Sequence, residues 1–168
     1  MLNIELAGDE DAAAILALRH GATDWLAERG IRQWDRSEMP MSTVLEHVRR
    51  REYYVVSREP GGPVLGALRL VWSDLDIWGH QEEFSGYVHG LVIDRSQAGT
   101  KLGSQLLEWA AGRARNAGAA LLRLDCTEHN MALRDYYARA GFVEVGRRDF
   151  GTVWYSLILL ERRIASDL

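Results

Sequence analysis

The sequence predicts a mixed α/β (α+β) protein in which a central mixed sheet of about seven strands is flanked by about four helices. Strand-like and helix-like segments alternate along the chain, with no internal repeat and no low-complexity linker. Residues 87–126 show the order strand, glycine-bearing turn, amphipathic helix and strand, which is typical of a βαβ unit with parallel strands. The 168 residues fit a single domain, 1–168, that buries roughly 70% of its unfolded surface.

The first half of the chain contributes four of these elements. We expect a strand over 3–7 and then a helix that starts at the acidic residues 9–11 and ends near Gly30. After Pro40, Ser42 can cap a short helix over 42–50. Two strands, 53–57 and 64–72, flank a Pro-Gly-Gly turn and are expected to form a hairpin. The polar residues 73–85 that follow are expected to form a surface loop that can line a substrate site.

The second half supplies the remaining elements. A strand over 87–93 leads through the turn 98–103 into a helix, and a second strand over 121–126 is expected to lie parallel to the first. The helix has one apolar face at spacings near 3.6 residues, formed by Leu102, Leu106, Leu107, Ala110 and Ala114. We further expect a helix over 132–140 that ends at Gly141, and two long strands over 142–150 and 152–160.

The composition of the chain argues against some classes of binding partner. The net charge is -4, from 20 basic and 24 acidic residues spread along the chain, which argues against nucleic acid and against an anionic membrane. Cys126 is the only cysteine, so we expect no internal disulfide and a reducing compartment, with the cytoplasm as the default. No signal peptide or membrane span is expected from the sequence. The five histidines show no ligand spacing, so we expect no metal site.

The turn after the strand 87–93 has the features of an anion site. The first N–H groups of a helix have no partner within the helix, and the positive end of the helix dipole lies there. Glycine allows a phosphate to come close to the backbone. The sequence therefore predicts a phosphate-bearing cofactor at this turn.

This turn and a later segment together resemble a known family. The strand Leu91-Val92-Ile93 and the turn up to Gly103 precede Asn130, which opens the run Asn-Met-Ala-Leu-Arg-Asp-Tyr-Tyr-Ala-Arg-Ala-Gly-Phe ending at Phe142. The ordered set resembles the GNAT superfamily of acetyl-CoA-dependent N-acetyltransferases. The resemblance is strongest over 87–142, and the order of elements in the whole chain is compatible with it. It implies a GNAT fold whose sheet is splayed at the cofactor site.

The resemblance implies a role for specific residues. Leu91 and Ile93 would offer backbone groups to the pantetheine arm of acetyl-CoA, and Asn130 would bond the same arm through its side-chain amide. Tyr137 matches the tyrosine that lies near the thioester sulfur in the family. The pyrophosphate would lie on the backbone amides of Gly99, Thr100, Lys101, Leu102, Gly103 and Ser104.

The turn departs from the usual family pattern, Gln/Arg-x-x-Gly-x-Gly/Ala. Ala98 replaces the polar residue, Lys101 replaces the first glycine, and only Gly103 is retained. Lys101 can donate a charge-assisted hydrogen bond to a phosphate, or its Cβ can narrow the approach and weaken binding. The sequence leaves both effects open.

His89 is the first candidate for the general base. A primary amine has a pKa near ~10.4 and must lose a proton before it attacks a thioester. His89 lies two residues before Leu91, on the same face of the strand, and it is similar in position to strand histidines of the serotonin N-acetyltransferase branch. The alternatives are that His89 is a half-buried structural residue, or that an acid of the loop acts through water: Asp74, Asp76, Glu82 or Glu83.

The remaining catalytic roles follow from the resemblance. The backbone amide of Leu91 would donate to the oxyanion, and Tyr137 would protonate the leaving thiolate. Tyr137 can instead be a core residue, with Tyr136 as the acid, and Asn130 can instead be a helix N-cap. Cys126 is expected to be a core residue rather than a nucleophile.

The predicted activity is therefore transfer of an acetyl group from acetyl-CoA to a primary amine. Trp34, Trp72 and Trp78 lie in or near segments that build the acceptor pocket in the family, and aromatic rings beside acids suit a cationic amine. The alternatives are a GNAT fold that binds an acyl-CoA without turnover, as a sensor or partner module, and a nucleotide-binding protein, for which the usual glycine loops are missing. An exposed edge in the C-terminal strands predicts that the chain can form a homodimer.

Overall fold

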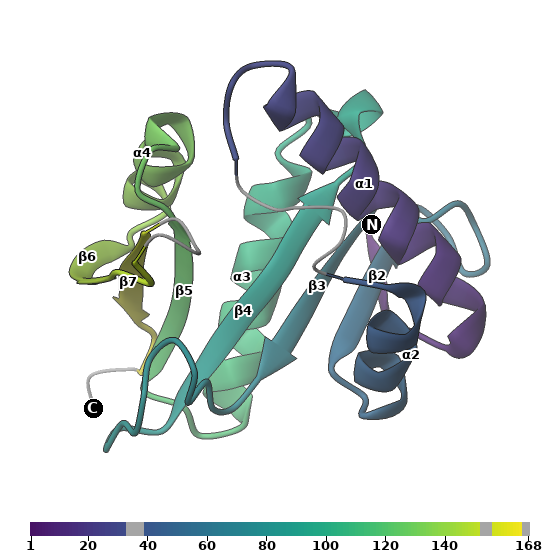
Figure 1. The fold of residues 1–168 in the computed structure, drawn as a ribbon. Coiled ribbons are helices and arrows are strands. Elements are labelled where there is room, and N and C mark those ends of the chain that lie inside the picture. The colour runs from purple at the N-terminus through teal and green to yellow at the C-terminus, as the bar shows by residue number, and fades with distance from the viewer. Residues whose placement is uncertain (33–38, 152–155, 166–168) are drawn as a thin grey trace. The chain divides into compact units, whose positions relative to one another are not determined.

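The computed structural model describes residues 1–32, 39–151 and 156–165 (Figure 1). Its seven-stranded sheet has the order β1-β2-β3-β4-β5-β7-β6 and contains parallel and antiparallel pairs. This is the mixed α/β architecture that the sequence predicts. The chain forms two compact units, Met1–Leu70 with Gly90–Leu106 and Val71–His89 with Leu107–Leu168.

The first unit is a layer of helices on antiparallel strands. β2 pairs antiparallel with β1 and with β3, and Tyr53 lies opposite Arg69, which confirms the predicted hairpin. Helices α1 and α2 pack on these strands (Figure 1), where Ile15, Val44 and Tyr53 belong to one buried apolar cluster. Its elements are β1 (Asn3–Leu6), α1 (Ala12–Ala27), α2 (Met41–Arg49), β2 (Tyr53–Ser57), most of β3 (Gly66–Val71) and the end of β4 (Ser85–Ile93).

The predicted capping of α2 by Ser42 is wrong. The helix begins at Met41, and Pro40 occupies the N-cap position with φ -69° and ψ 161°. A proline fits the start of a helix because its fixed φ is already close to the helical value and its missing N–H would have had no partner there. The helix therefore needs no hydroxyl cap, and Ser42 lies within its first turn.

The second unit is built around β5 (Leu121–Thr127). On one side β5 pairs antiparallel with β7 (Leu157–Arg163) along its whole length, and β7 also pairs with β6 (Val143–Arg148). On the other side β5 runs parallel to β4, as predicted. Helix α4 (Met131–Arg139) follows β5, and Gly141 ends it with φ 89°, the left-handed conformation expected of a helix C-terminus.

The last strand lies further along the chain than predicted. β7 ends at Arg163 rather than at 160, and residues 152–155 of the predicted strand lie outside the described residues. β7 continues because its charged end pairs with β5: Glu161 lies opposite Arg123, and the Arg123 Nε donates to Glu161 Oε2 at 3.0 Å. β6 is shorter than predicted and ends at Arg148.

Helix α3 (Leu102–Asn116) runs through both units and has the apolar face that the sequence predicts. Leu102, Leu106, Leu107, Ala110 and Ala114 are all buried. Within the described residues, every helix is too short or too polar to cross a membrane.

Candidate active site

The parallel ladder between β4 and β5 is short. It comprises three pairs and ends where Tyr87 lies opposite Arg123, although both strands continue. His89 lies two residues after Tyr87, and Asp125 lies two residues after Arg123. Because side chains alternate along a strand, each of these residues is on the same face of its strand as the last paired residue. The register thus directs His89 and Asp125 toward each other just beyond the ladder.

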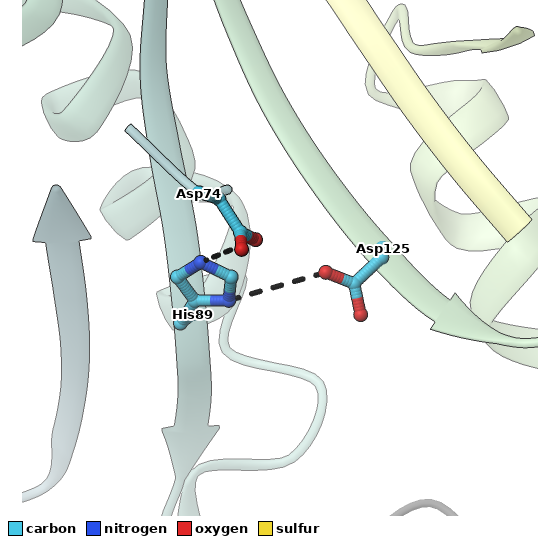
Figure 2. A group of neighbouring side chains, drawn as sticks. All are labelled: Asp74, His89 and Asp125. Atoms are coloured by element: carbon cyan, nitrogen blue, oxygen red, sulfur yellow. Dashed lines mark ion pairs between the residues drawn. The ribbon is translucent and has the colours of Figure 1, made fainter. Parts of the chain in front are cut away.

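A cluster of one imidazole and two carboxylates results (Figure 2). Asp74, from the loop before β4, places Oδ2 3.1 Å from His89 Nε2, and Asp125 places Oδ2 3.9 Å from His89 Nδ1. The exposed fractions of the side chains are 21% for His89, 10% for Asp74 and 13% for Asp125. The cluster is therefore largely buried and can still be reached from solvent.

Asp74 is held in place by its own turn. Its Oδ1 accepts the Ile77 N–H at 3.2 Å, and its backbone carbonyl accepts the Trp78 N–H at 2.9 Å. A side chain fixed in this way presents its other oxygen to His89 in a defined direction. Asp74 was expected as an alternative base, and the structure instead places it beside the histidine.

The position of Asp125 disfavours the charged form of its carboxyl. Burial raises the pKa of its carboxyl to about 6; the nearby His89 lowers it and the charge of Asp74 raises it. Asp125 Oδ2 is buried, and no hydrogen-bond donor of the described residues reaches it. The basic side chain beside this carboxyl is the imidazole of His89, 3.9 Å away.

Asp74, His89 and Asp125 could also be considered as metal ligands. Within the described residues, they form a group whose possible ligand atoms all lie within 4.8 Å of one another. The two carboxylates lie near different ring nitrogens of His89, whereas one metal ion binds one nitrogen of a histidine. The arrangement resembles that of a histidine base held between acids more closely than a metal centre.

Tyr137 lies on α4 and is buried. Its ring packs edge-on against Phe142 and against Tyr136, with centroids 5.8 and 5.6 Å apart. Burial raises the pKa of its hydroxyl strongly, and Cys126 and Asp125 raise it further. Tyr137 therefore stays protonated at neutral pH, and it lies near enough to Asp125 for that carboxylate to influence its hydroxyl.

Asn130 caps α4, which is the alternative that the sequence left open. Its Oδ1 accepts the Leu133 N–H at 3.2 Å, and the residue is buried. Cys126 is buried and free, and burial raises the pKa of its thiol to about 12. A thiol that remains protonated is a poor nucleophile, in keeping with the expected core role.

The predicted cofactor turn lies in the first unit. Lys101 has φ 64° and Gly99 has φ 81°, so the lysine adopts a conformation that glycine prefers. The helical ladder begins where the Gln105 N–H bonds the Lys101 carbonyl, and the amides of Leu102 and Gly103 precede that bond. The Thr100 N–H already donates to the Gln97 carbonyl at 3.1 Å. Ser104 is exposed on the first turn of α3.

Leu91 and Ile93 follow a bend in β4. Gly90 has φ 58°, a left-handed value inside a strand, and Leu91 beyond it is partly buried. Ile93 helps to line a cavity of about 300 Å³ in the first unit, together with small residues of α1 and with Arg95. The structure thus gives the two residues different surroundings within the same strand.

The other expected acids and aromatic residues are spread out. Asp76, Glu82 and Glu83 are exposed, and Glu83 pairs with Arg163 at 3.3 Å. Trp72 is exposed and packs against Phe84 with centroids 5.5 Å apart, whereas Trp78 is buried. Trp34 lies outside the described residues.

Comparison with known proteins identifies the family. The model of the acetyltransferase (GNAT) family matches residues 19–142. The chain belongs to this family. An uncharacterized N-acetyltransferase of Bacillus subtilis, YesJ, is 28% identical over 142 residues, which are 82% of this chain and 79% of YesJ. An aminoalkylphosphonate N-acetyltransferase of Salmonella typhimurium is 33% identical over 81 residues, which cover 48% of this chain and 51% of that protein.

Solved GNAT structures share the fold. A GNAT acetyltransferase from Listeria monocytogenes superposes with a TM-score of 0.79 at 23% identity, over 96% of this chain and 94% of that one. YncA from Salmonella typhimurium, solved with its cofactor acetyl-CoA, gives 0.72 at 18% identity over 100% and 96% of the two chains. The predicted GNAT fold is confirmed.

Sequence reasoning missed Asp125. The strand around it reads Leu-Leu-Arg-Leu-Asp-Cys, so two charged residues alternate with apolar ones in an otherwise buried strand. Such a pattern places both charges on one face, which is the face that His89 occupies on the neighbouring strand. The alternation was a usable signal that a polar site lies there.

Proposed function

We propose that this GNAT protein is an acyltransferase that moves an acetyl group from acetyl-CoA to a primary amine by direct attack in a ternary complex. One observation carries the proposal: His89, expected to be the base, lies 3.1 Å from Asp74 and in the same unit as the protonated Tyr137. YncA, which shares the fold, was solved with acetyl-CoA, and the names of the sequence relatives specify N-acetylation.

In this mechanism the Asp74 carboxylate, 3.1 Å from Nε2 of His89, favours a proton on that nitrogen by its charge, so that the Nδ1 lone pair is available. The amine enters as an ammonium ion and gives one proton to His89. Its nitrogen then forms the C–N bond to the acetyl carbon, and the carbonyl oxygen gains charge opposite the Leu91 N–H. When the C–S bond breaks, the thiolate takes a proton from Tyr137, which recovers one from the nitrogen of the new amide.

The resemblance supplies the cofactor contacts of the proposal. Leu91, Ile93 and Asn130 would hold the pantetheine arm. The amides from Gly99 to Ser104 would hold the pyrophosphate, except that of Thr100, which donates to the Gln97 carbonyl. The capping bond of Asn130 uses Oδ1, so its Nδ2 is the atom that we assign to the cofactor. Lys101 has a left-handed backbone conformation, with φ 64°, which a glycine at this position would adopt without strain.

The test combines binding with turnover. Calorimetric titration should show micromolar, CoA-selective binding, with ATP and NAD as controls, and a panel of primary amines should release free CoA. His89→Gln should keep the binding and lower kcat by about 10²-fold or more. Tight CoA binding without turnover of any amine would favour the sensor module, which the loss of the turn glycine also favours. No CoA binding near millimolar concentrations would contradict both functions.

Assembly and location are also proposals. β6 is the last strand in the sheet order, and its residues are all exposed, which suits an edge that pairs with a second copy. We propose a homodimer in the cytoplasm. Size-exclusion chromatography with light scattering tests the dimer, and a monomer at high concentration would contradict it.

A further inference from the structure

Asp125 is the buried carboxylate that the proposed mechanism does not use. It comes from β5, which pairs with β7 along its length, and Asp125 itself lies opposite Leu159 in that ladder. The backbone that carries it is therefore held by β7 from one side. Its Oδ2 has no hydrogen-bond donor among the described residues and lies 3.9 Å from His89 Nδ1.

We infer that Asp125 is a positioning residue for His89: its carboxylate stabilises the imidazolium that forms when His89 takes the proton of the acceptor amine. The inference rests on the proposed function for the source of that proton. The coupling between the two side chains can be measured without any acceptor.

The contacts of His89 carry the argument. Asp74 lies nearest Nε2, and Asp125 lies nearest Nδ1, so the two carboxylates approach different nitrogens of one ring (Figure 2). A protonated imidazole carries hydrogen and positive charge on both nitrogens, and a neutral one carries hydrogen on one of them. The arrangement therefore fits the imidazolium better than the neutral ring. At 3.9 Å the Asp125 carboxylate acts by charge, because a hydrogen bond requires a shorter distance.

The other titratable groups near Asp125 do not compete for this role. Burial raises the pKa of Tyr137, on α4, and that of Cys126, on β5, so both remain neutral at physiological pH. Arg123, two residues before Asp125 on β5, is paired with Glu161 and donates to the Tyr87 hydroxyl. Asp74 from the loop and Asp125 from β5 are the carboxylates that pair with His89 among the described residues. Partial burial strengthens their effect, since a charge in a poorly hydrated site is weakly screened.

The experiment compares Asp125→Asn with wild type by NMR titration of the His89 imidazole in the free protein. We expect the midpoint of the His89 titration to be lower in Asp125→Asn than in wild type, because the substitution removes a carboxylate 3.9 Å from Nδ1. Asp135→Asn is the matched control, because Asp135 is exposed on α4. An unchanged midpoint in a folded Asp125→Asn protein would overturn the inference.

Two further measurements distinguish a failure of the proposed function from a failure of the coupling between Asp125 and His89. If no amine is acetylated but the midpoint shifts, the proposed function fails and the coupling stands. If an amine is acetylated, Asp125→Asn should lower kcat by about tenfold or more with KM for acetyl-CoA unchanged. Should the variant not fold, the wild type decides: coupled groups titrate with shared inflections in the His89 and Asp125 carboxyl signals, and independent curves would refute the coupling.

Discussion

Replacement of Asp125 by asparagine should stabilise the protein at neutral pH, even though it should impair catalysis. Burial raises the pKa of this carboxyl from 3.8 to about 6 in the folded state. A difference of roughly two pKa units corresponds to about 3 kcal/mol, and asparagine keeps the shape without the charge. Because Asp125 has some exposed surface and a histidine beside it, about 3 kcal/mol is the upper bound.

The sign follows from proton linkage. The folded state binds this proton more tightly than the unfolded chain, so the stability from Asp125 is fully present below pH 3.8 and is lost as pH rises through about 6. Asparagine does not titrate, so Asp125→Asn does not lose stability in this way as pH rises. The difference in stability between variant and wild type should therefore be small near pH 4 and should grow in favour of the variant up to pH 8.

Urea denaturation at half-unit steps from pH 4 to pH 8 measures that difference, with Asp135→Asn as the control for loss of an exposed charge. The comparison at each pH cancels the titrating groups that Asp125 does not influence, and the NMR titration of His89 accounts for the neighbouring group that it does influence. A difference that does not change with pH, or a variant less stable than wild type at pH 8, would refute the assignment of a buried, destabilised carboxylate. The first result would mean that the Asp125 carboxyl titrates normally in the folded state.

Three further predictions concern other residues. Lys101→Gly should raise the free energy of unfolding by about 1 kcal/mol, because φ 64° strains a lysine but not a glycine; urea unfolding measures this, and calorimetry with CoA shows whether the lysine helps or hinders binding. Tyr137→Phe should lower kcat by about 10²-fold with KM for acetyl-CoA unchanged, and an equal or larger fall in Tyr136→Phe would move the acid to Tyr136. Burial and Arg69 lower the pKa of His47 below 6.5, so the stability that neutral His47 contributes to the folded protein is present above pH 6.5 and is lost as pH falls. The Tm of His47→Gln should therefore decrease less steeply below pH 6.5 than the Tm of wild type. An equal decrease in both proteins would contradict the lowered pKa of His47.

The sequence alone was enough to predict the fold because its signals are local. The Pro-Gly-Gly turn predicts the β2–β3 hairpin, the apolar face of α3 predicts that helix, and the order strand, helix, strand predicts that β4 and β5 are parallel. The ends of the elements were less predictable. β7 extends to Arg163 because Glu161 meets Arg123 across the sheet, and no local pattern shows that a charged tripeptide has a strand partner.

The site was only partly predictable for the same reason. His89 could be chosen because its position on the strand and its chemistry both suit a base. The role of Asp74 depends on a turn that directs one oxygen to Ile77 and the other to His89, which the sequence of a polar loop does not reveal. Asp125 depends on the register between two strands, which becomes known only when Tyr87 is seen opposite Arg123.

The last pair of the β4–β5 ladder also controls where Asp74 lies. Arg123 donates to the Tyr87 hydroxyl at 3.0 Å, and the Trp78 ring packs edge-on against Tyr87 with centroids 5.9 Å apart. The guanidinium of Arg123 lies 4.9 Å from the centroid of the Trp78 ring, a cation–π distance. The Trp78 ring thus contacts both Tyr87 and Arg123, and the backbone N–H of Trp78 donates a hydrogen bond to the Asp74 carbonyl.

This network supports the site from the point where the strands stop pairing. Beyond Tyr87 the backbone of β4 is not paired with β5, so strand pairing does not fix the orientation of the His89 side chain. Asp74 provides it from a loop, and the loop is anchored on the last residues that do pair. A loop acid fixed in this way can orient the imidazole of His89 although the ladder has ended. The network of Arg123, Tyr87 and Trp78 therefore supports Asp74 beside His89 at the point where the β4–β5 ladder ends.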